Sequence, residues 1–243
     1  MTTIAENLEA VRSVIATAAG KAGRRVDDVA LVAVTKTHPP EAVAEAMSAG
    51  QLLFGESRVQ EARAKVPLLP GRAHWHFIGH LQRNKIRHAL ALGFELLHGI
   101  DSLEIARDLD RVASEAGAHP SVLLEVNVAG ESSKFGFSPA KLRAQMEELL
   151  ALARLQIEGF MTIAPFAPDA EASRPHFVAL RELRDQVEKE FRASLPQLSM
   201  GMSGDYGVAI EEGATLVRVG TAIFGARSGK AWKPNAESAM LDD

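Results

Sequence analysis

One lysine follows an apolar run near the start of the chain and could carry covalent chemistry. The segment LVAVTKTHPP places Lys36 at the end of this run, shortly before two prolines. A neutral lysine is a nucleophile that condenses with carbonyl groups, and burial favours the neutral form. A lysine that merely reaches solvent from a strand end is the simpler alternative. The groups that face Lys36 in the folded chain therefore decide between these interpretations.

Two segments near the C-terminus have the composition of phosphate-binding loops. MSGDYG contains Ser203 and Gly204, and RVGT contains Gly220 and Thr221. Glycine lets backbone N–H groups approach a phosphate closely, and hydroxyl groups add donors. Neither segment contains lysine, so such a site would bind phosphate through backbone dipoles and hydroxyls. Ordinary strand-to-helix turns have the same composition, and this alternative stays open.

Arg218 lies two residues after Leu216 and two before Gly220, so the three share one face of a predicted strand. An interior arginine is costly without a partner, and a solvated or ion-paired position is the alternative. Facing a ligand, its guanidinium would donate hydrogen bonds without losing its proton. An amine, a phosphate site and such a donor are together what pyridoxal 5′-phosphate (PLP) requires. A pyridine nitrogen bonded to arginine stays unprotonated, which disfavours most carbanion chemistry of PLP.

The elements that must position these residues alternate along the chain. Short apolar runs are followed by amphipathic stretches, with helices predicted over 102–117 and 174–191 among others. This alternation and a length of 243 residues predict an α/β fold, a closed (β/α)8 TIM barrel in a single domain. An open doubly wound sheet is the alternative, although no G-x-G-x-x-G motif follows the first strand. The predicted strands cover 29–36, 52–56, 74–79, 94–100, 122–128, 157–163, 197–203 and 216–221.

A barrel carries its functional site at the C-terminal ends of the strands, where Lys36 would meet MSGDYG and RVGT. We expect residues 1–28 to form an extra N-terminal helix that packs on the barrel, because apolar residues recur there at helical spacing. Residues 29–230 are expected to form the PLP-binding barrel, and residues 231–243 a loosely ordered tail.

Composition excludes several classes of function. The formal net charge of −4 disfavours a nucleic-acid partner, and the absence of cysteine excludes disulfides, thiol catalysis and Cys-ligated zinc. No apolar run approaches the ~20 residues of a membrane span, and the N-terminus lacks the features of a secretory signal. We therefore expect a cytoplasmic protein without a membrane partner.

Six motifs in consistent order resemble the pyridoxal phosphate homeostasis protein family. They are AVTKTHP, FGESRVQEA, WHFIGHLQRNKIR, NVAGESSKFG, GFMTIAP and LSMGMSGDYGVAIEEGATLVRVGTAIFGAR, within residues 29–227. The resemblance implies a barrel like the N-terminal domain of alanine racemase. It implies that Lys36 holds PLP as a Schiff base, that Ser203, Gly220 and Thr221 hold its phosphate, and that Arg218 lies by the ring nitrogen. It also implies a non-catalytic protein that carries or buffers PLP and maintains vitamin B6 and amino-acid homeostasis.

Four further residues complete the expected cofactor-binding set. Gly204 belongs to the phosphate segment, and Met202 and His80 are expected at the rim, although Met202 also suits a core position. Ser57 stands where the family usually has asparagine, so its contact with the cofactor ring is open. Expected partners are PLP and PLP-dependent apo-enzymes as recipients, and the protein is expected to be a monomer.

Two enzymatic functions are the alternatives. A PLP-dependent racemase of the alanine racemase type needs a base on each face of the substrate. Lys36 could serve one face, but the sole tyrosine, Tyr206, lies in the expected phosphate segment, and we expect no second domain. A zinc hydrolase could use His74, His76 and His80, but packed strand histidines are the favoured interpretation. No catalytic residue and no metal ligand are assigned.

Overall fold

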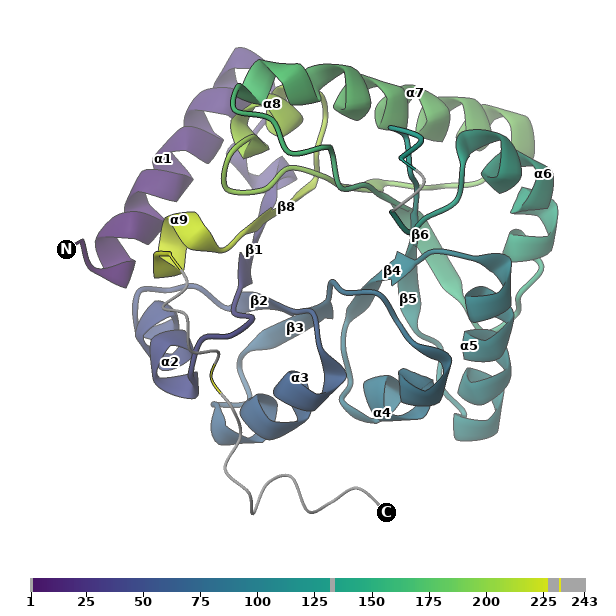
Figure 1. Cartoon of the computed structure of the whole chain (residues 1–243), viewed down its shortest axis with the longest axis horizontal. Helices are drawn as coiled ribbons and strands as arrows, with labels where there is room; N and C mark the ends of the chain where they lie inside the picture. The colour runs from purple at the N-terminus through teal and green to yellow at the C-terminus, as the bar shows by residue number, and fades with distance from the viewer. Residues whose placement is uncertain (1, 132–133, 227–231, 233–243) are drawn as a thin grey trace.

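Eight parallel strands close into a barrel in the computed structural model, which describes residues 2–131, 134–226 and 232. Neighbouring strands pair in chain order, and β8 pairs with β1 to complete the ring. Helices surround the strands (Figure 1). The prediction of a (β/α)8 barrel is confirmed. The strands are β1 Ala30–Val34, β2 Leu53–Glu56, β3 His74–Phe77, β4 Leu96–Ile100, β5 Ser121–Glu125, β6 Gln156–Met161, β7 Gln197–Ser199 and β8 Leu216–Val219.

Six of the predicted strands run two to four residues past the observed C-terminal ends. The reason is that apolar residues continue beyond the sheet: Val126 after β5 and Met200 after β7 are both buried. These residues belong to the loops at the mouth of the barrel but are buried as strand residues are. The apolar pattern of the sequence therefore does not show where the strands end.

The helices form the outer layer, and two of them match their predicted ranges closely. Helix α5 follows its N-cap Ser102 and ends at Gly117, which adopts the left-handed conformation with φ of 66°. Helix α7 coincides with the predicted 174–191. The helices are α1 Ile4–Lys21, α2 Pro40–Ser48, α3 Val59–Lys65, α4 Ile86–Ala91, α5 Leu103–Ala116, α6 Pro139–Leu150, α7 Arg174–Phe191, α8 Tyr206–Glu211 and α9 Thr221–Phe224, with 3-10 helices at Val26–Asp28, Val66–Leu68, Arg83–Lys85 and Ala170–Ser173.

Helix α1 precedes the βα units. It begins with a capping box in which Thr3 Oγ1 accepts from the backbone N–H of Glu6, and the Glu6 carboxylate accepts from that of Thr3. Its apolar face, with Leu8, Val11 and Ile15, is buried. Helix α1 packs against α2, α8 and α9 (Figure 1).

The barrel interior changes character along its axis. An apolar cluster inside the strands contains Val32, Leu96, Leu123, Met161 and Leu216. Side chains two residues further along a strand lie on the same face, so the next interior positions toward the C-terminal ends follow directly. Three of these five positions are polar and buried, namely His98, Glu125 and Arg218, and the other two are Val34 and Ile163. The mouth of the barrel is therefore lined by charged and hydrogen-bonding groups above an apolar base.

The predicted tail at 231–243 lies outside the described residues, except for Trp232. The backbone N–H of Trp232 donates to the carbonyl of Thr37 at 3.1 Å. Within the described ranges, no helix combines the length and the apolar character needed to cross a bilayer.

Candidate cofactor site at the barrel mouth

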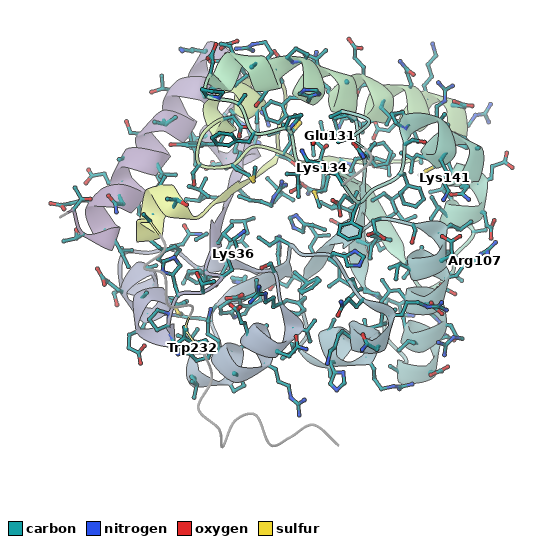
Figure 2. All side chains as sticks on the ribbon, in the orientation of Figure 1. Lys36, Arg107, Glu131, Lys134, Lys141 and Trp232 are labelled. Carbon is teal, nitrogen blue, oxygen red and sulfur yellow. The ribbon has the colours of Figure 1, made fainter. Side chains whose placement is uncertain are left out.

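Lys36 lies in the turn that follows β1, half-buried at the C-terminal end of the strand (Figure 2). The backbone on both sides of it is held by hydrogen bonds. Lys65 Nζ donates to the carbonyl of Thr35 at 2.9 Å, and the N–H of Thr37 donates to Glu61 Oε2 at 2.9 Å. Thr37 adopts a left-handed conformation with φ of 69°, uncommon for a β-branched residue. Helix α3, which carries Lys65 and Glu61, therefore holds the backbone on both sides of Lys36.

A fully buried ion pair supports this turn. Lys65 Nζ lies 2.5 Å from Glu56 Oε1, and both side chains are 0% exposed. Thr35 Oγ1 donates to the same carboxylate oxygen at 2.6 Å. Burial raises the pKa of Glu56, and the charge and hydrogen bond of Lys65 oppose that change. The ion pair joins Glu56 of β2 to Lys65 of α3, and Lys65 also donates to Thr35 beside Lys36. Removal of either partner would leave an uncompensated charge in the interior.

The two predicted phosphate segments meet. Ser203 Oγ accepts from the backbone N–H groups of Gly220 and Ala222, each at 3.3 Å. Thr221 is the first residue of α9 and is exposed. Ala222 was missed by sequence reasoning, although its position in the first turn of a helix after Gly220 signals an unpaired N–H group. A hydroxyl and backbone N–H groups thus converge at the mouth, as a phosphate site requires.

The two other residues of the MSGDYG region behave differently. A side chain at Gly204 would meet open space, so packing does not require glycine there. Met202 is 38% exposed at the rim, whereas Met161 and Met200 are buried in the core. The core interpretation of Met202 is therefore wrong, because the chain turns outward after Met200.

Arg218 is buried and bonded on two sides. Its Nη1 donates to Ser199 Oγ at 2.5 Å, and its Nη2 donates to the carbonyl of Thr162 at 2.9 Å. Burial lowers the pKa of Arg218 to about 10, while Glu125 and Asp205 oppose that change, so the guanidinium stays charged at neutral pH. Ser199 of the neighbouring strand β7 and Thr162, the residue that follows β6, therefore hold this cation in one orientation.

A hydrogen-bonded chain continues from Arg218 across the barrel interior. His98 Nδ1 lies 2.9 Å from Ser199 Oγ, and His98 Nε2 lies 3.0 Å from His76 Nδ1. Burial lowers the pKa of His76 to about 4 and that of His98 well below its usual range, so both are neutral at pH 7. Since arginine only donates, the Ser199 hydroxyl is free to donate to His98, which then donates to His76. Each member of the chain is satisfied in this direction.

The three histidines of the zinc alternative have separate partners. His74 is exposed and its Nδ1 lies 2.5 Å from Glu95 Oε1, while His76 bonds His98 inside the barrel. His80 Nδ1 lies 2.6 Å from Asp101 Oδ2. Across the described ranges, no cluster of three His, Cys, Asp or Glu could hold a metal.

His80 and Ser57 do lie together. Both line a cavity of about 330 Å³ between the loops after β2 and β3. Gly79 allows this approach, because a Cβ at that position would lie 2.1 Å from the carbonyl oxygen of Ser57. The His80 ring stacks on Phe135 with a centroid distance of 4.0 Å. The rim of the mouth is thus continuous from β2 to the loop after β5.

Comparisons with known proteins agree with this architecture. The family model of the alanine racemase N-terminal domain matches residues 6–228. The pyridoxal phosphate homeostasis protein of Aquifex aeolicus is 42% identical over 223 residues, which are 91% of this chain and 97% of that protein. Its counterpart from Pseudomonas aeruginosa is 45% identical over 231 residues, covering 93% of this chain and 97% of that protein.

Solved structures give the same result. PipY from Synechococcus elongatus PCC7942, with PLP bound, has a TM-score of 0.81 and 40% identity, and the match covers 92% of this chain and all of PipY. A lysine/ornithine decarboxylase from Vibrio vulnificus, with a TM-score of 0.69 and 16% identity, shares the fold alone. The resemblance seen in the six motifs is confirmed: the chain belongs to the alanine racemase N-terminal domain family and is a member of the pyridoxal phosphate homeostasis proteins.

Proposed function

We propose that this protein binds PLP at the barrel mouth and carries or buffers it without significant turnover, maintaining vitamin B6 and amino-acid balance. The observation that carries the proposal is the convergence of Ser203 Oγ with the N–H groups of Gly220 and Ala222, at the same barrel end as Lys36 and Arg218. The likeness to PipY with PLP bound, at 40% identity over the whole of that chain, supports the choice of ligand.

Each residue has a distinct role in this proposal. The Lys36 amine holds the aldehyde carbon that PLP supplies, and Ser203, Gly204, Gly220, Thr221 and the N–H of Ala222 surround the phosphate. Arg218 uses two of its N–H groups on Ser199 and Thr162, which leaves further N–H groups to donate to a pyridine nitrogen. Ser57, His80 and Met202 border the ring and the rim.

The charge of Arg218 favours a carrier over an enzyme. A guanidinium that keeps its proton leaves the ring nitrogen unprotonated, and an unprotonated ring withdraws electrons weakly. Racemisation also needs a second base. The chain's one tyrosine, Tyr206, is buried at the start of α8, and burial raises its pKa, so it is poorly suited to that task.

An absorption spectrum of the purified protein tests the proposal. We expect a visible band of lysine-bound PLP that disappears in Lys36→Ala, and no conversion between D- and L-alanine. A spectrum without this band after incubation with PLP would refute binding. Alanine racemisation that is lost in Lys36→Ala would support the racemase instead.

The proposal extends to the setting of the protein. We infer a monomer in the cytoplasm that releases PLP to PLP-dependent apo-enzymes. Size-exclusion chromatography with light scattering tests the oligomeric state, and activation of an apo-enzyme by the loaded protein tests delivery. A dimeric mass, or activation no faster than by an equal concentration of free PLP, would count against these points.

A further inference from the structure

Glu125 is a carboxyl group for which the proposed cofactor site has no use. It ends β5 and is 7% exposed. Across the described ranges its carboxylate makes no hydrogen bond and no ion pair, in contrast to Glu56, another buried acid, which is paired with Lys65. Buried carboxylates are normally paired, because an isolated charge is costly in the interior. An unpaired one at the barrel mouth therefore calls for a partner that arrives from outside.

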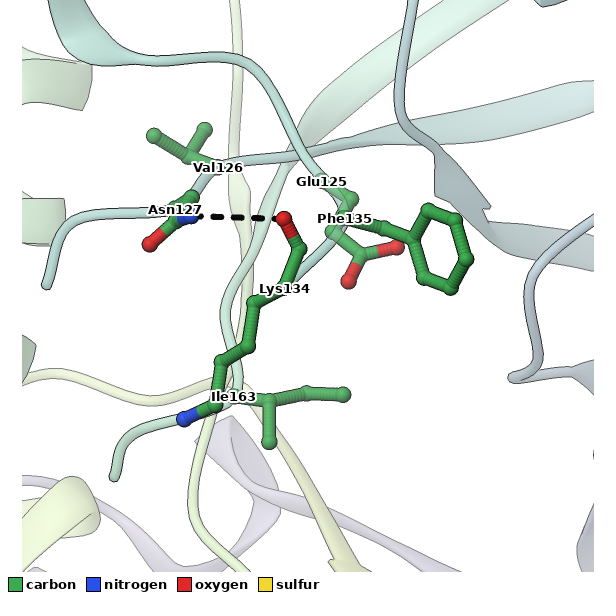
Figure 3. A pocket seen from close by; sticks show the side chains of 6 residues that line it. All are labelled: Glu125, Val126, Asn127, Lys134, Phe135 and Ile163. Atoms are coloured by element: carbon green, nitrogen blue, oxygen red, sulfur yellow. Dashed lines mark hydrogen bonds between the residues drawn. The ribbon is translucent and has the colours of Figure 1, made fainter. Parts of the chain in front are cut away.

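The group lies at a small pocket between the loops after β5 and β6 (Figure 3). The pocket encloses about 160 Å³, enough for a molecule of a few heavy atoms. Its walls include Val126, Phe135 and Ile163, and the last two are 59% and 40% exposed. The pocket therefore offers a ligand two kinds of surface. Its walls are apolar side chains, and one carboxyl group supplies a negative charge.

Hydrogen bonds join the described residues on both sides of the loop that supplies Phe135. Asn127 Nδ2 donates to the carbonyl of Glu131 at 2.8 Å and reaches that of Lys134 at 3.5 Å, the latter drawn in Figure 3. Lys134 Nζ, which also borders the pocket, is paired with Glu131 Oε1 at 2.7 Å. This cation is therefore neutralised by its own loop and leaves Glu125 without a partner.

Burial and three charged groups act on the pKa of Glu125 in opposite directions. Burial and the charge of Asp101 raise it, Arg218 and His80 lower it, and together they leave it at about 7. The carboxyl group is thus half-ionised near neutral pH. A cationic ligand would draw Glu125 fully into the ionised form, whereas an anionic ligand would be repelled by the ionised carboxylate.

We propose that this pocket binds a small primary amine, with the ammonium on Glu125 and the alkyl part against Val126, Phe135 and Ile163. What the bound amine does there rests on the proposed function. With PLP held on Lys36, the Glu125 carboxylate would take one proton from the ammonium and leave a neutral, nucleophilic amine. Exchange would then form one carbon–nitrogen bond to the amine and break the one to Lys36, while the two remaining N–H protons of the amine would pass to the Lys36 nitrogen. The amine thereby competes with Lys36 for the cofactor.

Calorimetric titration with n-butylamine tests binding. The protein is first reduced with borohydride, so that PLP stays fixed and exchange cannot contribute. We expect Glu125→Gln to weaken butylamine binding at least tenfold, while the exposed control Glu9→Gln binds as the wild type does. Butyrate and n-butanol, which match the alkyl chain without the cation, are expected to bind at least tenfold more weakly than butylamine. At pH 7 binding should release about half a proton, measured in buffers of different ionisation enthalpy.

Equal butylamine affinity in Glu125→Gln and the wild type, or butyrate binding as tight as butylamine, would overturn the inference. Phe135→Ala changes an exposed residue of the wall and provides a second test. The ratio of the affinities for butylamine and methylamine should shrink several-fold in this variant. An unchanged ratio would contradict the assignment of Phe135 to the pocket wall. The visible band of each unreduced variant is recorded in parallel. A normal band without amine binding refutes the pocket alone, whereas a missing band in the wild type refutes the proposed function.

Discussion

At the scale of single residues, Arg218 is held by a chain of buried polar groups that crosses the barrel. Ser199, His98 and His76 come from three strands separated by up to 123 positions, and their chain exists only because the barrel closes. The sequence allows Lys36 and Arg218 to be selected, because each stands out from an apolar strand, but it assigns no role to Glu125, whose lack of a partner is a property of the folded structure.

Removal of the Ser199 hydroxyl should destabilise the fold. In Ser199→Ala, Arg218 Nη1 and His98 Nδ1 both lose a buried partner. We expect the free energy of unfolding to fall by about 1–3 kcal/mol in urea denaturation. Ser13→Ala, an exposed control on α1, should stay within about 0.5 kcal/mol of the wild type. Equal stability of both variants would show that the chain contributes nothing.

Ser203 should hold the phosphate. Ser203→Ala removes the hydroxyl at which the N–H groups of Gly220 and Ala222 converge. A lost charge-assisted phosphate bond costs on the order of 1.5–3 kcal/mol, so the dissociation constant of PLP should rise at least tenfold. Equilibrium dialysis measures it, with Ser13→Ala as control. Wild-type retention in Ser203→Ala would contradict the assigned phosphate site.

Glu125 should make stability depend on pH. Its folded pKa of about 7 lies above the ordinary 4.5, so its contribution to stability is fully present below pH 4.5 and is lost as the pH rises to 7. Glu125→Gln removes this dependence and should gain up to about 3 kcal/mol relative to the wild type between pH 4.5 and 8. Urea denaturation of both proteins at several pH values measures the difference. A difference that does not change with pH would contradict the raised pKa.

At the scale of elements, helix ends were predictable where local chemistry decides them. Ser102 and Gly117 delimit α5 through a side-chain cap and a left-handed residue, both of which are local signals. The ends of strands were not predictable in this way, because the buried residues Val126 and Met200 continue the apolar pattern into the loops. The role of α3 as the support of the Lys36 turn was also invisible, since it depends on the pairing of Lys65 with Glu56.

Helix α3 should control the position of Lys36. Lys65→Met strands the buried Glu56 carboxylate and frees the Thr35 carbonyl, which should cost about 3–5 kcal/mol of unfolding free energy and weaken PLP retention. The double variant Lys65→Met/Glu56→Met should recover most of the stability but not the retention. The matched control Lys21→Met changes a 67% exposed lysine and should alter neither the stability nor the PLP retention. Urea denaturation measures the stability of each variant, and the visible band measures its PLP retention. Full PLP retention in the double variant would exclude a role of Lys65 in positioning Lys36.

At the scale of the whole molecule, strand-helix alternation and length were enough to predict the closed barrel, because few other folds satisfy both. Closure brings residues 36, 203, 218 and 220 to one end of the barrel although they span most of the chain. The sequence could not show what closure does to the interior, where an apolar base gives way to a polar layer with one charged arginine.

The most direct test of PLP binding at Lys36 is the site of covalent attachment. The protein is incubated with PLP, reduced with borohydride, digested and sequenced by mass spectrometry. We expect the reduced PLP adduct on Lys36 at close to one per chain, with Lys65 and Lys134 unmodified. An adduct spread over other lysines, or none on Lys36, would contradict it.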